Sequence, residues 1–156
     1  MAQLHINNLY RVWFTWVDPL ILIPTVYALI FTPEIMLDSL IPLSISPYNA
    51  DQGFFFHQLA ALYAFVGMIL AGVLRASSDI KVWRIVIGAV LLVDLSILVS
   101  VYVSIEQQGR MDLAKLRWQD WGNLVFTGWV AVLRSLFLAG VGVGDGNNKT
   151  KKGKRA

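Results

Sequence analysis

The sequence contains no cysteine and few charged residues. Without a thiol among its 156 residues, the chain has no disulfides, thiolate nucleophiles or cysteine metal sites. Charged residues make up 15%, against about a quarter in soluble domains, and the mean hydropathy is +0.60. Histidine occurs only twice, without HxxxH or HxxE spacing, and there is no GxSxG elbow or P-loop, so we expect no metal and no cofactor. Composition predicts a membrane protein.

The apolar residues fall into four runs, each long enough to cross a hydrocarbon core of about 30 Å. We place the spans at residues 12–31, 54–74, 85–102 and 121–141. They predict an all-α fold, a four-transmembrane-helix bundle that forms one domain (1–141), followed by a disordered basic tail (142–156). Between the first two spans, residues 35–43 are apolar enough to lie on the interface as a lid.

The distribution of lysine and arginine predicts the topology. Nine basic residues, five of them in the tail, lie on one side of the predicted membrane, and only three lie on the other. By the positive-inside rule, both termini are expected to be cytosolic. We expect an integral membrane protein of the endoplasmic reticulum. A basic tail beside a membrane indicates topology or anionic lipid, and no nucleic-acid partner is expected.

Three ionisable residues lie inside the predicted spans: Asp18, Asp94 and Arg134. At about 1.5 Å per residue, all three fall in one layer, in the cytosolic half or the middle of the bundle. Charged groups inside a membrane are costly and usually functional. One arginine neutralises one carboxylate, so the second is expected to be protonated or solvated. A buried Asp–Arg pair that merely holds helices together stays an alternative.

Other polar side chains are expected to continue this layer along the bundle axis. Asn123 and Thr127 share a helix face with Arg134. His57 and Gln58 are expected to form a second polar layer with Asn123 and Asp120, nearer the lumenal surface. Trp129 is deep enough to line a cavity. The remaining tryptophans that we expect to anchor the interface are Trp13, Trp16, Trp83, Trp118 and Trp121.

Three motifs resemble those of a family of small fungal four-span membrane proteins. They are Asp18-Pro19, the run LRASSDIKVWR (74–84) followed by Asp94, and DWGN (120–123) followed by Leu133-Arg134. The chain also resembles, in size, span number and charged layer, the membrane hydrolases of fungal polyene-pyrone clusters, such as those of aurovertin and citreoviridin. Glutamate is expected to be commoner than aspartate at the first-span position, and the shorter side chain of Asp18 changes its reach.

The second resemblance implies an epoxide hydrolase or cyclase of polyketide secondary metabolism, which opens polyepoxides to diols or polyethers. Epoxide opening needs an acid at the ring oxygen and a base that activates water or an internal hydroxyl. By analogy with the Asp-Arg-Asp site of limonene-epoxide-type hydrolases, Asp94 is the expected base and Asp18 the expected acid, and the reverse assignment stays open. We expect four further residues to position water or the substrate: His57, Asn123, Tyr27 and Tyr63.

The expected partners are a hydrophobic epoxide, the lipid bilayer and a pathway monooxygenase. A homo-oligomer is an open alternative, since small residues at Gly67, Ala71, Gly72 and Gly88 can seat another helix. Two other classes of function stay open. One is a sterol- or lipid-binding protein or isomerase similar to the emopamil-binding proteins. Arg134 argues against this class, because a site that binds a cation should not contain a cationic side chain. The other is a non-catalytic membrane scaffold.

Overall fold

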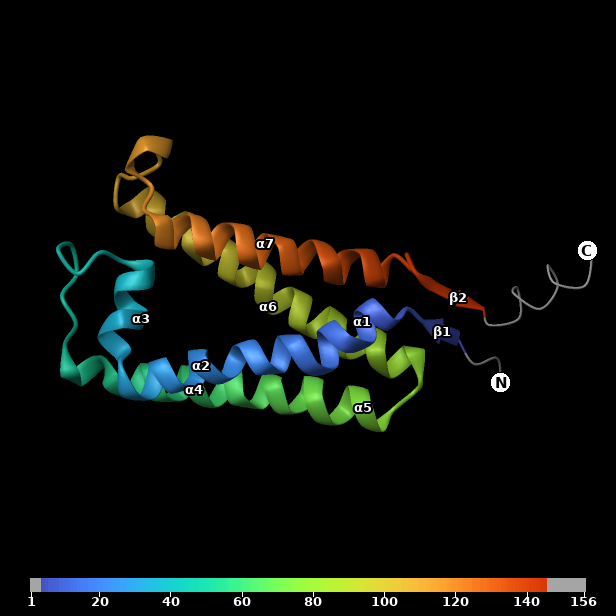
Figure 1. The fold of residues 1–156 in the computed structure, drawn as a ribbon. Helices are drawn as coiled ribbons and strands as arrows, with labels where there is room; N and C mark the ends of the chain where they lie inside the picture. The colour runs from blue at the N-terminus through green and yellow to red at the C-terminus, as the bar shows by residue number, and fades with distance from the viewer. Residues whose placement is uncertain (1–3, 146–156) are drawn as a thin grey trace, which may run out of the picture.

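Four long apolar helices make up most of the chain (Figure 1). The computed structural model describes residues 4–145, so most of the predicted tail, residues 146–156, lies outside the described residues. The helical segments, each long and apolar enough to cross a membrane, are Asn8–Phe31, Ala50–Ala76, Ile80–Gln107 and Trp118–Leu138. The fold is all-α apart from one short two-stranded sheet.

The first two long helices each contain a π-helical turn. The first consists of α1 (Asn8–Val12), the turn Trp13–Val17 and α2 (Asp18–Phe31). The second consists of a 3₁₀ turn (Ala50–Gln52), α4 (Gly53–Met68), the turn Ile69–Val73 and α5 (Leu74–Ala76). The two π-helical turns pack against each other. A π-helical turn shifts the rotation of the helix that follows it, and such turns are frequent at functional sites.

The third long helix, α6 (Ile80–Gln107), extends beyond the predicted span at both ends. The connection between the second and third spans, residues 75–84 in the predicted boundaries, is therefore only a short segment between Ala76 and Ile80. Asp79 caps α6, because its side chain accepts a hydrogen bond from the Lys81 backbone N–H at 2.9 Å. A short 3₁₀ turn (Leu113–Lys115) leads from α6 to α7 (Trp118–Leu138).

The long helices form two antiparallel pairs. Helix α2 packs along α4, and α6 packs along α7 (Figure 1). Gly67, one of the small residues expected to seat another helix, faces α2, where a Cβ built on this glycine would lie 3.6 Å from Leu22 Cδ1. Large apolar side chains on the outer faces are exposed, for example Leu62, Ile85 and Val125. An exposed apolar surface on every long helix is what a hydrocarbon environment requires.

A buried aromatic cluster holds the two pairs together at the end where both termini of the described chain lie (Figure 1). The Phe137 ring lies 5.3 Å from Tyr10 and 5.7 Å from Phe14, edge to face in both cases. Trp83 is buried in the same cluster, and its indole N–H donates to the Ser77 carbonyl at 2.8 Å. Trp83, which we expected to anchor the interface, is only 2% exposed and uses its indole N–H within the protein.

The sheet joins the two ends of the described chain. Strand β1 (Leu4–Ile6) pairs antiparallel with β2 (Val143–Asp145). Residues 143–145, which we assigned to the tail, therefore form a strand. Gly142, directly before β2, adopts a φ of 74°, which favours glycine. A Cβ there would also lie only 3.2 Å from the Tyr10 ring.

The segment after the first span contains the short helix α3 (Pro33–Leu40). This segment includes most of the predicted lid at residues 35–43. Helix α3 packs against both α2 and α7 and lies at the end of the bundle opposite the termini (Figure 1).

Candidate functional site

The three ionisable residues of the spans lie together. Arg134 on α7 donates from Nη1 to Asp94 on α6 and from Nη2 to Asp18 at the start of α2. All three side chains are buried, since Arg134 is 3% exposed, Asp18 6% and Asp94 8%. The cluster thus joins one helix pair to the other through two charge-assisted hydrogen bonds.

One nitrogen of the cluster has no protein partner. Arg134 Nε is buried, and among the described residues no acceptor lies within hydrogen-bonding distance. Buried polar atoms in folded proteins are almost always paired with protein or ordered water. Arg134 therefore keeps a donor available for water or for an oxygen of a bound molecule.

An apolar cavity of about 240 Å³ adjoins the cluster and lies between the helix pairs. All four long helices and α3 contribute to its wall. Asp18, Asp94 and Arg134 line it, together with three residues that we expected at the site, Tyr63, Asn123 and Thr127. Most of the other lining side chains are aliphatic or aromatic. A mostly apolar cavity with a few convergent polar groups is typical of a small-molecule site.

Helix α3 closes one side of this cavity, through Met36, Ser39 and Leu40. Asn123 fixes it there, because its side-chain N–H donates to the Ser39 carbonyl at 3.0 Å. Asp38 accepts hydrogen bonds from Arg117 at 3.3 Å and from Gln119 at 3.4 Å. Asn123 thus both lines the cavity and ties α3 to α7.

Four other predicted site residues are not among those that line the cavity. Tyr27 is 61% exposed and Trp129 is 54% exposed, while His57 and Gln58 lie on the exposed surface of α4. The reason is helix rotation, at about 100° per residue. Tyr27 follows Asp18 by nine residues and thus points about 180° away, and Trp129 is about 140° from Arg134. Depth in the membrane alone does not predict which way a side chain points.

A second buried ion pair lies beyond α3, near the start of α7. Asp120 accepts from Arg110 at 2.5 Å and 3.3 Å, and from the Arg117 backbone N–H at 2.8 Å. Asp120 was expected in a polar layer with His57 and Gln58. No sequence pattern indicated the Arg110 partner, which lies in the loop after α6. Neither residue lines the cavity.

In the part of the chain that the structure describes, no group of three or more histidine, aspartate or glutamate side chains could hold a metal ion. The ionisable side chains on the cavity wall are two carboxyl groups, a guanidinium and the phenol of Tyr63.

The four long apolar helices define a polytopic, all-α protein that associates with the lipid bilayer. The chain belongs to the family described as Domain of unknown function (DUF7704), whose profile matches residues 3–144. This range includes the three motifs noted in the sequence. No curated protein and no solved structure matches the chain.

Proposed function

We propose that this protein is a membrane-embedded epoxide hydrolase or cyclase of fungal secondary metabolism, which opens polyene or polyketide epoxides without a metal. The observation that carries the proposal is the buried Asp18–Arg134–Asp94 cluster on the wall of an apolar cavity. An aspartate pair bridged by an arginine supplies both an acid and a base, and epoxide opening needs both.

The charge balance of the cluster supports an acid and a base. With one carboxyl protonated, the cluster of two carboxyls and one guanidinium is neutral. With both ionised it carries a net negative charge, which is costly to bury inside a membrane. A single shared proton therefore leaves one carboxylate and one carboxylic acid beside the same cavity.

In the proposed reaction, the Asp94 carboxylate takes a proton from water or from a hydroxyl of the substrate. The oxygen of that group attacks an epoxide carbon, the carbon–oxygen bond of the ring breaks, and the ring oxygen takes the proton of Asp18. The product is a diol or a cyclic ether. Transfer of a proton from Asp94 back to Asp18 restores the starting state, while Arg134 holds both carboxyls in place.

The cavity favours a hydrophobic substrate. Its volume of about 240 Å³ is below the range of about 300–1,000 Å³ common for ligand sites. The epoxide-bearing part of a polyene fits this volume, and the rest of the chain would extend between the helix pairs toward the lipid. A pathway monooxygenase would supply the epoxide. A second copy of this chain is a further proposed partner, which light scattering of the detergent-solubilised protein tests.

The experiment that tests the proposed reaction is incubation of the purified protein with a polyene epoxide in ¹⁸O-labelled water. A diol or ring hydroxyl that carries the label indicates attack by water. An unlabelled cyclic ether indicates attack by a hydroxyl of the substrate. If no epoxide is consumed beyond the rate in protein-free micelles, the proposed activity is wrong. Binding of a sterol or an amine drug by the same protein would then favour the emopamil-binding type of function.

We also propose that both termini face the cytosol and that the membrane is that of the endoplasmic reticulum. In support, Arg11, Arg75, Lys81 and Arg84 belong to the ends of α1, α5 and α6 that lie beside the termini (Figure 1). The opposite end of the bundle holds Arg110, Lys115 and Arg117, and part of their charge is neutralised by Asp38 and Asp120.

A further inference from the structure

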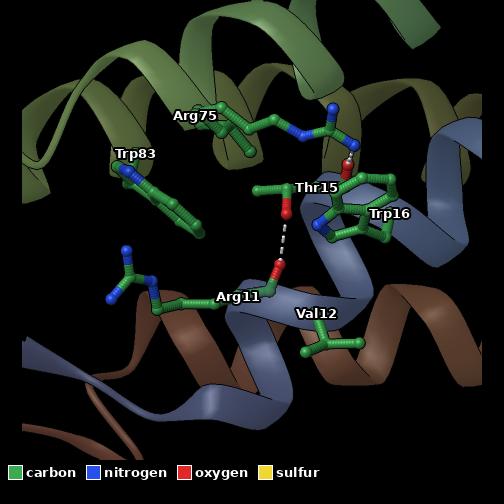
Figure 2. A pocket seen from close by; sticks show the side chains of 7 residues that line it. Arg11, Val12, Thr15, Trp16, Arg75 and Trp83 are labelled. Atoms are coloured by element: carbon green, nitrogen blue, oxygen red, sulfur yellow. Dashed lines mark hydrogen bonds between the residues drawn. The ribbon is translucent and has the colours of Figure 1, made fainter.

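A second hollow, which the proposed reaction does not use, opens at the end of the bundle where the termini lie. We call it the arginine groove. Its volume is about 280 Å³, and Figure 2 shows its side chains. Its lining residues, all in the described part of the chain, include two arginines and two tryptophans but no carboxylate: Arg11, Val12, Thr15, Trp16, Leu74, Arg75 and Trp83.

Pro19 explains why an arginine lies in this groove. Proline has no backbone N–H, so the Thr15 carbonyl, four residues earlier, lacks its α-helical donor. Arg75, from the end of the second span, donates to that carbonyl through Nη2 at 2.5 Å (Figure 2). The motif at 74–84 thus contacts the turn of the first helix that precedes Asp18-Pro19.

Arg75 is exposed, and its guanidinium also contacts Trp16. It lies 3.7 Å above the centre of the Trp16 ring, in a cation–π contact. Only Nη2 is used by Thr15, so the other N–H groups remain available. The contact with Trp16 restricts the Arg75 guanidinium. Less side-chain entropy is therefore lost when this group binds an anion.

Arg11 supplies the second charge. It lies in the last turn of α1, is exposed, and its guanidinium makes no hydrogen bond or ion pair within the described residues. Figure 2 shows its side chain directed toward the region below Trp83, away from the Arg75 guanidinium. The groove therefore presents two guanidinium groups at separate places on one wall of aromatic and aliphatic side chains.

The groove lies where the predicted spans 12–31 and 54–74 begin and end, since Arg11 and Arg75 directly flank them, and lipid headgroups are expected at this level. Arg11 is three residues from the start of its long helix and Arg75 is one residue from the end of its own, so both are within about 5 Å of the helix ends at 1.5 Å per residue. Exposed Trp16 is of the residue type enriched at this level. An anion that enters this groove from the bilayer must carry its charge at the membrane surface.

We propose that the arginine groove binds the phosphate of an anionic phospholipid, with the acyl chains lying along the apolar surface of the first two spans. Arginine binds phosphate through paired N–H donors. In the proposed topology this end of the bundle faces the cytosolic leaflet, which is rich in anionic lipid. This proposal does not depend on the proposed epoxide chemistry, because the groove and the cavity share no lining residue.

Native mass spectrometry of the full chain, released from micelles that contain equal amounts of phosphatidic acid and phosphatidylcholine, tests it. We expect phosphatidic acid to bind preferentially. Arg11→Gln and Arg75→Gln should each weaken its binding about tenfold, which corresponds to about 1.4 kcal/mol. The matched control is Lys81→Gln, which removes one exposed charge at the same end but outside the groove, and we expect it to change binding less than twofold.

Arg11→Gln is the decisive variant, because Arg75→Gln also removes a contact between helices. Equal phosphatidic acid binding by Arg11→Gln and Lys81→Gln would overturn the proposal, and so would equal binding of the two lipids by the unaltered protein. A third arm adds inorganic phosphate at millimolar concentration. Displacement of the lipid by inorganic phosphate would show a site for soluble phosphate and would overturn the assignment to a phospholipid.

Discussion

At the scale of single residues, Arg134 determines the charge at the centre of the bundle. It contacts two carboxyls on two other helices, and its Nε has no partner among the described residues. A cluster whose only task is to hold helices together needs one carboxylate for one arginine. The second carboxyl is therefore what supports the proposed reactive site, while an unpaired arginine N–H does not, because Arg117 at the other ion pair also has N–H groups without a hydrogen-bond partner among the described residues.

Asp120 is the matched case of a buried carboxylate that lies outside the cavity. It is 1% exposed and accepts hydrogen bonds from Arg110 and from the Arg117 backbone. Breaking a buried pair leaves an uncompensated charge, so Asp120→Ala should lower the free energy of unfolding by about 3–5 kcal/mol. Equilibrium unfolding in mixed detergent micelles measures this loss.

The control for that measurement is Asp51→Ala, which removes an exposed carboxylate in the 3₁₀ turn before α4. It should change the free energy of unfolding by no more than about 0.5 kcal/mol. Equal losses for the two variants would mean that the Arg110–Asp120 pair does not stabilise the fold.

Several residues of the candidate site were predictable from the sequence and several were not. Depth along each span predicted that Asp18, Asp94 and Arg134 share a layer. Depth also put Trp129 at the cavity, and the expected chemistry put Tyr27 there, but rotation about the helix axis points both side chains away from it. The partner of Asp120 was not predictable, because Arg110 lies in a loop whose path no periodic pattern specifies.

At the scale of helices, Pro19 couples the first two spans. It removes the α-helical donor of the Thr15 carbonyl, and Arg75 replaces that donor from the other helix. The proline predicts that a carbonyl lacks its helical donor. It does not predict that Arg75 replaces that donor, or that both helices contain a π-helical turn near this hydrogen bond. A π-helical turn depends on how two helices pack, and hydropathy reports only that the helices exist.

A double-mutant cycle tests this coupling. Arg75→Gln should cost about 1.5 kcal/mol in the unaltered chain, because the hydrogen bond has a charged donor. In a Pro19→Ala background the new backbone N–H at position 19 can serve the Thr15 carbonyl, so the same change should cost at least about 1 kcal/mol less. Unfolding free energies of the four proteins provide the cycle. Costs that add within about 0.3 kcal/mol would contradict the proposed exchange of donors.

At the scale of the whole molecule, the number and order of the four apolar helices followed from composition and hydropathy. Their ends did not, since α6 continues well past the apolar run into polar sequence at both ends. Helix α3 was recognisable as an apolar segment. Its position over the cavity was not predictable, because the Ser39–Asn123 and Asp38–Arg117 contacts that hold it there join distant parts of the chain.

The absence of cysteine makes the proposed topology directly testable, because single cysteines can be introduced without background. Ser78→Cys lies in the exposed connection between α5 and α6, and Leu113→Cys lies at the other end of the bundle. In sealed microsomes, an impermeant maleimide should label Ser78→Cys at once and Leu113→Cys only after detergent is added. The opposite pattern would place both termini in the lumen, and the unaltered chain should take no label.

The measurement that tests the central claim most directly is the rate of polyene-epoxide opening by Asp18→Asn beside Asp120→Asn, expressed per folded molecule. Both changes replace a buried aspartate that contacts an arginine with an amide of similar size, and only Asp18 lines the cavity. Loss of a catalytic acid or base should slow the reaction by about 10²–10⁴-fold. We therefore predict at least about a hundredfold loss for Asp18→Asn and little change for Asp120→Asn. Equal rates for the two folded variants would contradict a catalytic role for the cluster and would leave it as an ion pair that holds the helices together.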